Sequence, residues 1–228
     1  APVSFRIAPR MLGNLHRAVT RAETAAGRML AAVTDNPVFI APDAAHPNGR
    51  VLSNGGFHGA ASPPALDAIT AAYADLAQIA ERQAVKILDG AHSGLPDQLM
   101  SGWPEDERYL GCLGMSAVGW AERAKAQCSA TLLPGSESGG FGANDVASPV
   151  FLAWEKTVIA GEALDATLAV LAVVGSQALH VTRRNAPAAL APVLDQVRKT
   201  APPIDSAVPP GPHAGALAAL YGTETYKL

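Results

Sequence analysis

Apolar residues recur every three or four positions along most of this chain, which is the spacing of an amphipathic helix. The clearest stripe has these members: Leu66, Ile69, Tyr73, Leu76, Ala80 and Ile87. It begins after Ser62, which two prolines follow, and it stops at Gly90. Serine before proline is typical of a helix start and glycine of a helix end, so we expect a helix over residues 62–89.

The same spacing predicts further helices, which loops rich in proline and glycine separate. Their expected ranges are about 11–33, 108–132, 149–184, 188–199 and 214–221. No alternation of apolar and polar residues is long enough to predict a strand. Helices of 25 to 35 residues are each roughly 37 to 52 Å long at 1.5 Å per residue. We therefore predict an all-α fold, a long-helix bundle that continues into other chains.

Proline divides the chain near its end. Residues 1–200 are expected to form one helical-bundle domain. Residues 201–228 are expected to form a proline-rich tail with a short C-terminal helix.

Composition supports the helical prediction and narrows the classes of partner. Alanine is abundant and aromatic residues make up only 5% of the chain, which favours closely packed helices over sheets. The net charge is -3 and the positive charges form no block, so we expect no nucleic-acid or membrane partner. The most apolar stretch, 166–179, is short for a membrane span and is interrupted by polar residues, so we interpret it as a buried helix.

The cysteines and histidines predict the compartment and exclude a metal. Cys112 and Cys128 fall on one expected helix, which would hold them about 24 Å apart, too far for a disulfide. Reduced thiols, and the lack of a signal-peptide pattern at the start of the sequence, are typical of a cytoplasmic protein. The histidines fall at no metal-ligand spacing, so we predict no metal site.

Two polar loops between the expected helices, 34–37 and 54–59, carry candidate chemistry. Asn36 offers both an amide donor and a carbonyl acceptor to a ligand, or it only closes the turn before a proline. Two glycines in the second loop would let Phe57 and His58 approach a ligand closely. The alternatives are that Phe57 is buried in the core and that His58 is a hydrogen-bonded structural histidine.

Arg6 and Asn144 are candidates outside these loops. The planar guanidinium of Arg6 matches a carboxylate in a bidentate pair, although an ordinary ion pair is the alternative. Asn144 follows the glycine-rich stretch 135–142. No strand precedes that stretch and no Gly-Lys-Ser/Thr closes it, so we exclude nucleotide binding and interpret it as a flexible active-site loop.

Taken in order, these motifs resemble the aromatic amino acid ammonia-lyase and aminomutase family, which includes the histidine, phenylalanine and tyrosine ammonia-lyases. The matching segments are Ser4-x-Arg6-x-x-Pro9, Thr34-Asp35-Asn36-Pro37-Val38, Gly55-x-Phe57-His58-Gly59, Glu81-Arg82 with Ser93-Gly94-Leu95-Pro96 downstream, and Asn144-Asp145-Val146-Ala147-Ser148. The resemblance spans nearly the whole chain. It corresponds to roughly the second half of a full-length family member.

The resemblance implies a long helix bundle, assembled as a tetramer with active sites shared between subunits. It also implies a methylidene-imidazolone electrophile, formed from an Ala-Ser-Gly triad, and a tyrosine base. By position, Asn36 and Asn144 match catalytic residues, the first orienting substrate and electrophile and the second facing the substrate amine. Arg6 matches the arginine that holds the substrate carboxylate, and Phe57, followed by His58, matches the aromatic residue near the electrophile.

The chain also departs from the family pattern. It contains no Ala-Ser-Gly triad, so the electrophile is expected only from a partner chain. Val3 stands where the family has the tyrosine of Tyr-Ser-x-Arg, and Asn144 stands where the family has Gln or Glu. The first change replaces a phenol that could hydrogen-bond with an alkyl group, and the second shortens the side chain.

Three functions are open, and the sequence favours the first. The chain is an enzyme subunit or fragment that acts on a small amino acid-like substrate, in a hetero-oligomer with an Ala-Ser-Gly-bearing chain or in a homo-oligomer. Alternatively, it is a catalytically inactive lyase-like binding or scaffold protein. A third option is a different elimination that needs no such electrophile.

Overall fold

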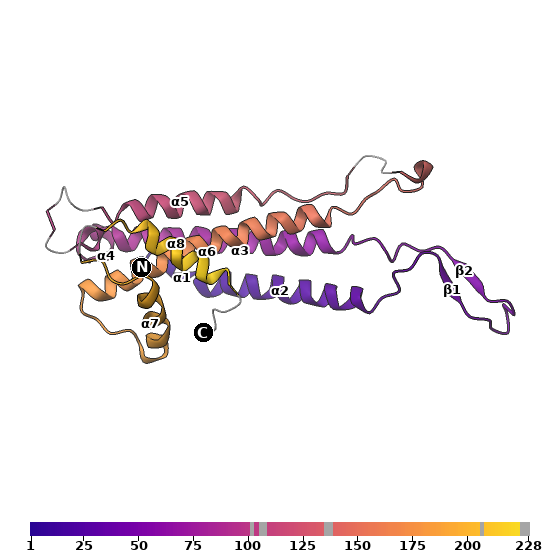
Figure 1. Ribbon diagram of the computed structural model, residues 1–228, viewed down its shortest axis with the longest axis horizontal. Helices are drawn as coiled ribbons and strands as arrows, with labels where there is room; N and C mark the ends of the chain where they lie inside the picture. The colour runs from indigo at the N-terminus through magenta and orange to yellow at the C-terminus, as the bar shows by residue number, and fades with distance from the viewer. Residues whose placement is uncertain (101–102, 105–108, 135–138, 206–207, 224–228) are drawn as a thin grey trace.

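Four long helices run side by side in this chain (Figure 1). A computed structural model describes residues 1–100, 103–104, 109–134, 139–205 and 208–223. The long helices are α2 (Ala8–Leu30), α3 (Ser62–Leu88), α5 (Cys112–Lys125) and α6 (Val150–Val181). The predicted all-α, long-helix bundle is confirmed.

Shorter elements join or cover the long helices. The α-helices among them are α1 (Val3–Arg6), α4 (Gly90–Ser93), α7 (Ala191–Thr200) and α8 (Gly211–Tyr221). Single 3-10 turns are η1 (Asp97–Leu99), η3 (Gly140–Gly142) and η4 (Ala188–Leu190). α1 packs on α3, and α8 packs on α6.

α6 is the central helix of the bundle and packs against α3, α5, α7 and α8. α6 has 32 residues, and its most apolar 18-residue window has a mean hydropathy of 1.8, so it would also suit a membrane span. Half of that window, however, is buried inside the bundle. Small residues let α3 and α6 approach closely, since Ala77, Ala160 and Ala163 are fully buried. Between these helices the hydroxyls of Thr70 and Thr157 share a buried hydrogen bond of 2.9 Å.

The segment after residue 200 also contributes to the core. Leu217 of α8 is fully buried in the same apolar cluster as Val170 and Val174 of α6. The side chain of Gln177 holds the backbone of Ile204 on α6, because its amide donates to the Ile204 carbonyl (3.0 Å) and its oxygen accepts from the Ile204 N–H (2.9 Å). The separate tail over 201–228 stays a prediction.

The structure also contains two short strands that the sequence did not predict. β1 (Val38–Ile40) and β2 (Arg50–Leu52) form an antiparallel pair in which Phe39 lies opposite Val51. This hairpin projects beyond the helices at the right-hand end of Figure 1. Each strand has three residues, which is too short to produce a recognisable alternation in the sequence.

The helix expected over 108–132 is shorter than predicted. α5 ends at Lys125, so Cys128 lies beyond it, and both cysteines are free thiols. Arg108, its predicted start, lies outside the described residues.

A polar cluster fixes the extended chain that follows α5. Asp67 of α3 accepts from the N–H (2.6 Å) and the hydroxyl (2.7 Å) of Thr131. Lys156 of α6 donates to Asp67 (3.4 Å), to the Thr131 hydroxyl (2.7 Å) and to the Ser129 carbonyl. Partial burial would raise the pKa of Asp67, but the Thr131 hydrogen bonds and the Lys156 charge lower it below its usual value. This cluster therefore fixes Ser129 and Thr131 against α3 and α6.

Candidate active site

The two polar loops singled out in the sequence interlock where α2 ends and α3 begins. The side-chain oxygen of Asn36 accepts from the Asn54 N–H (2.8 Å) and from the Ser53 hydroxyl (3.2 Å). In return, the side-chain amide of Asn54 donates to the Asp35 carbonyl (2.8 Å), and its oxygen accepts from the Gly56 N–H (2.7 Å). The structure therefore brings the two loops together as one polar unit.

A glycine makes this close contact possible. A Cβ atom on Gly56 would lie 2.3 Å from the Val33 carbonyl oxygen and 2.9 Å from Asn54 Oδ1. No side chain larger than hydrogen fits there while the loops stay interlocked. Gly55, its neighbour, has nothing within 4 Å of a Cβ built on it.

Asn36 keeps one group for a ligand. Its oxygen is engaged by the second loop, whereas its side-chain nitrogen makes no hydrogen bond within the described part of the chain. Asn36 is exposed, so this amide donor faces outward from the interlocked loops.

Phe57 and His58 come directly after Gly56 in the second loop, and they differ in exposure. Phe57 is 56% exposed, so it is not a core residue of this chain. The Nε2 atom of His58 is buried and, like the buried hydroxyl of Ser148, has no hydrogen-bond partner among the residues described. Gly59 packs against Ser148, since a Cβ there would lie 3.2 Å from the Ser148 hydroxyl.

The segment between η3 and α6 lies at the same end of the bundle as these loops (Figure 1), and Asn144 belongs to that segment. It is exposed, and its backbone N–H donates to the Gly139 carbonyl (3.2 Å). Gly139, Gly140, Phe141 and Gly142 all have positive φ. Residues 135–138 of the expected flexible loop lie outside the described part.

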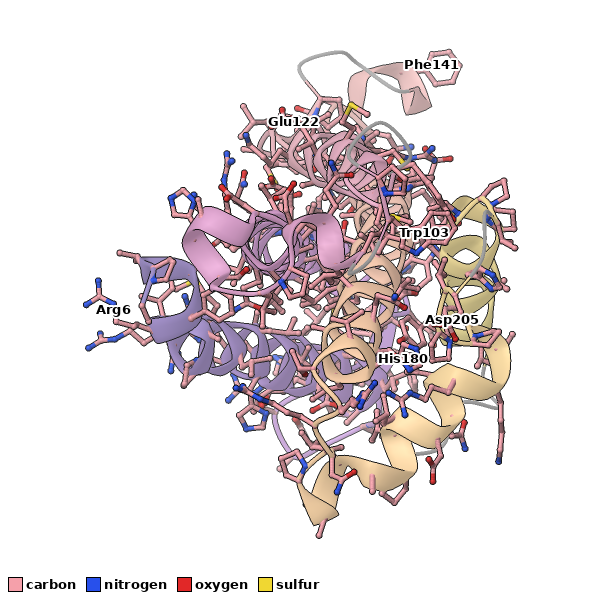
Figure 2. The ribbon with its side chains drawn as sticks, turned by 90° about the vertical axis from the view of Figure 1, so that its left-hand side faces the viewer. Arg6, Trp103, Glu122, Phe141, His180 and Asp205 are labelled. Atoms are coloured by element: carbon pink, nitrogen blue, oxygen red, sulfur yellow. The ribbon has the colours of Figure 1, made fainter. Side chains whose placement is uncertain are left out.

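Arg6 lies at the opposite end of α2. It is the last residue of α1, it is exposed, and its guanidinium points away from the bundle (Figure 2). α1 is held on α3 where Gln83 donates to the Ser4 carbonyl (3.0 Å). α2 has 23 residues and therefore separates Arg6 from Asn36 by about 35 Å at 1.5 Å per residue. One copy of the chain does not place these two side chains on one small molecule.

The arrangement matches known proteins in sequence and in fold. The aromatic amino acid lyase family model matches residues 1–200. The chain belongs to the aromatic amino acid lyase family. Among curated relatives, the histidine ammonia-lyase of Streptomyces coelicolor is 38% identical over 136 residues, which are 58% of this chain and 25% of that protein. The histidine ammonia-lyase of Streptomyces avermitilis is 44% identical over 94 residues, or 41% of this chain and 17% of that protein.

Solved structures show the same fold for this lyase-family chain. Phenylalanine aminomutase from Pantoea agglomerans has a TM-score of 0.83 at 19% identity and covers 95% of this chain and 42% of its own. Histidine ammonia-lyase from Trypanosoma cruzi has a TM-score of 0.84 at 21% identity, with 96% and 42% covered. The chain thus spans less than half the length of these relatives, which fits a C-terminal portion of a family member.

Glu81 is a further feature of this lyase-family chain that the sequence analysis matched to the family but gave no role. Its side chain is 2% exposed. One carboxylate oxygen accepts from Gln78 (2.8 Å) and lies 3.2 Å from the Arg82 guanidinium. The other is buried without a partner among the described residues. Burial raises the pKa of Glu81, although Arg82 and Gln78 oppose the rise. The sequence did carry a signal for this residue, because Glu81 shares the apolar face of its helix with Ala77 and Ala84, which are buried.

The described part of this lyase-family chain gathers no three His, Cys, Asp or Glu side chains able to hold a metal ion. It also contains no Ala-Ser-Gly sequence from which methylidene-imidazolone could form. Its candidate groups for a ligand are the Asn36 amide and the Phe57 ring at one end and the Arg6 guanidinium at the other.

Proposed function

We propose that this chain supplies the C-terminal half of an ammonia-lyase or aminomutase active site that acts on a small amino acid. The observation that carries the proposal is the interlocked pair of loops. Within it the Asn36 oxygen accepts hydrogen bonds from the second loop, its side-chain nitrogen makes none among the described residues, and Phe57 of the second loop is exposed. An outward amide and an exposed aromatic ring are suited to orient a small amino acid.

A complete site requires more than one polypeptide copy. Arg6 would bind the substrate carboxylate through its two parallel N–H donors. Because α2 keeps Arg6 about 35 Å from Asn36, the Arg6 that serves a given Asn36 comes from a second copy. The exposed and uncovered position of both side chains supports this assembly.

The electrophile would come from a segment or partner chain that carries Ala-Ser-Gly. Methylidene-imidazolone would withdraw electrons from the substrate so that ammonia can leave. The residues present fit a position beside that group, because Phe57 offers an apolar ring and Asn36 an amide donor. In this proposal Asn144 faces the substrate amine, and His58 lies behind Phe57. The two free thiols support a cytoplasmic location.

The test is reconstitution with an Ala-Ser-Gly-bearing partner. We would purify the chain with its co-expressed partner, supply histidine, phenylalanine or tyrosine, and measure release of ammonia and of the unsaturated acid or β-amino acid. Arg6→Ala is expected to lower kcat/KM by at least tenfold, since it removes charge-assisted hydrogen bonds to the carboxylate. Arg10→Ala, at an exposed arginine of α2, is the matched control and should leave kcat/KM unchanged. Absence of turnover in every such assembly contradicts the proposal.

A binding or scaffold protein is the second candidate, and Val3 favours it. Val3 is 56% exposed where the family pattern has a tyrosine, so the group lost is on the surface that a ligand would face. Calorimetric titration with amino acids separates the two functions. Saturable binding that Arg6→Ala abolishes, without turnover in the complete assembly, supports a binding protein.

A further inference from the structure

A cavity lies at the end of the bundle away from the interlocked loops. It has a volume of about 590 Å³ and lies between the C-terminal end of α6, α7 and the segments around Leu99 and Ile204. α6 has 32 residues and therefore separates the cavity from the loops by about 48 Å. Figure 2 views this end of the molecule, with Trp103, His180 and Asp205 on the cavity side.

Three arginines are among the residues that line this cavity: Arg183 and Arg184, which are exposed, and Arg198. Arg198 is half-buried and is fixed on α6, because its Nε and Nη2 donate to the Ser176 hydroxyl (3.2 Å) and carbonyl (3.4 Å). Asp205, a carboxylate in the lining, lies 2.7 Å from His180 instead. Within the described residues, no ion pair joins any of the three arginines to a carboxylate.

The backbone keeps Arg183 in an unfavourable conformation. The Arg184 N–H donates to the Leu179 carbonyl (3.0 Å) and the Arg183 N–H to the His180 carbonyl (3.0 Å), which is the Schellman pattern at a helix end. Arg183 occupies the left-handed position of that pattern, with φ of 53°. Glycine is the usual residue there because a side chain is disfavoured at positive φ. Arg183 thus occupies this position at a conformational cost.

The helix dipole does not account for this arrangement. Arginines near a helix C-terminus interact favourably with a partial charge of about -0.5. That charge is smaller than the charge of three guanidinium groups. The helix dipole would favour arginines at the C-terminal end of any helix, so it does not explain why these three line one cavity.

We propose that this cavity binds a small organic phosphate. A phosphate group carries three acceptor oxygens and nearly two negative charges, which suits three guanidiniums better than a single carboxylate does. The volume of about 590 Å³ falls within the roughly 300–1,000 Å³ of small-molecule sites and exceeds what phosphate alone fills. The organic part would lie along Trp103 and Val181, which also line the cavity. This site is separate from the proposed amino acid site.

The test uses the full chain in the assembly that it forms, titrated calorimetrically with glycerol phosphate, inorganic phosphate and succinate at constant ionic strength. Arg183→Gly and Arg184→Ala are each expected to weaken glycerol phosphate binding about tenfold, the loss of one charge-assisted contact. Arg28→Ala, at an exposed arginine in the last turn of α2, is the matched control and should bind as the wild type does.

Arg183→Gly also separates binding from folding. Glycine suits the left-handed position, so this variant should unfold at the same or a higher temperature than the wild type while it binds more weakly. Three results would overturn the proposal: no saturable binding of either phosphate, unchanged affinity in both variants, or succinate binding as tight as that of glycerol phosphate.

Discussion

The two polar atoms of the Asn36 side chain have different roles. The oxygen accepts two hydrogen bonds from the second loop, and the nitrogen is left for a ligand. Asn36→Asp keeps the acceptor and removes the donor. We expect its free energy of unfolding to change by no more than about 0.5 kcal/mol, as for an ordinary surface substitution. Amino acid binding or turnover should fall at least tenfold, because a donor is lost and a charge is added.

Calorimetry and thermal unfolding check both halves of this prediction. Wild-type binding by Asn36→Asp would show that the nitrogen has no ligand. A large loss of stability would instead mean that the amide is needed only for the loops.

Glu81 predicts a pH dependence of stability. Burial raises its folded pKa above the unfolded value. As the pH rises above about 4.3, the unfolded chain ionises this carboxyl before the folded chain does, so folding loses stability. Glu81→Gln removes that loss. The variant should therefore gain stability relative to the wild type as the pH rises from about 4 toward neutrality.

Urea unfolding at several pH values measures this difference. Glu155→Gln, at an exposed glutamate of α6, is the control and should show no such trend. A free energy of unfolding of Glu81→Gln that falls relative to the wild type as the pH rises would contradict the argument.

At the scale of elements, two adjacent glycines test whether the interlocked loops matter. Gly56→Ala forces a methyl group against the Val33 carbonyl, whereas Gly55→Ala meets nothing within 4 Å. We expect Gly56→Ala to separate the loops and to lower substrate binding or turnover at least tenfold. The melting temperature should fall only slightly, because the loops lie outside the buried clusters. Equal activity in the two variants would show that the loop contact is dispensable.

The sequence predicted the helices wherever a local signal marks their ends. The expected start at Ser62 agrees with the structure, and the helix expected to reach residue 89 ends at Leu88. α5 ends early because Asp67 and Lys156, distant in sequence, hold Thr131 in an extended segment. No local pattern reports such a contact. For the candidate site, the sequence indicated both loops, but only the structure shows that Asn54 joins them.

At the scale of the whole molecule, the separation of Arg6 from Asn36 predicts complementation between copies. Arg6→Ala and Asn36→Ala should each inactivate the assembly alone. If a site takes Arg6 from one copy and Asn36 from another, random mixing of the two variants in equal amounts leaves about one quarter of the sites intact. Co-expression of the variants, with turnover compared against each alone, measures this recovery. No recovery in verified mixed assemblies would place both residues of a site on one copy.

The hairpin of β1 and β2 affects how readily a single copy of the chain is cleaved by proteases. It extends past the helices, and Phe39, Val51 and Leu52 on it are exposed. Its two strands pair only with each other in the described structure. Such a tip opens easily and is the kind of segment that proteases cut first. Arg50 in β2 offers trypsin a site there. The rate of tryptic cleavage after Arg50, compared between the free and the assembled chain, therefore measures whether assembly covers this tip.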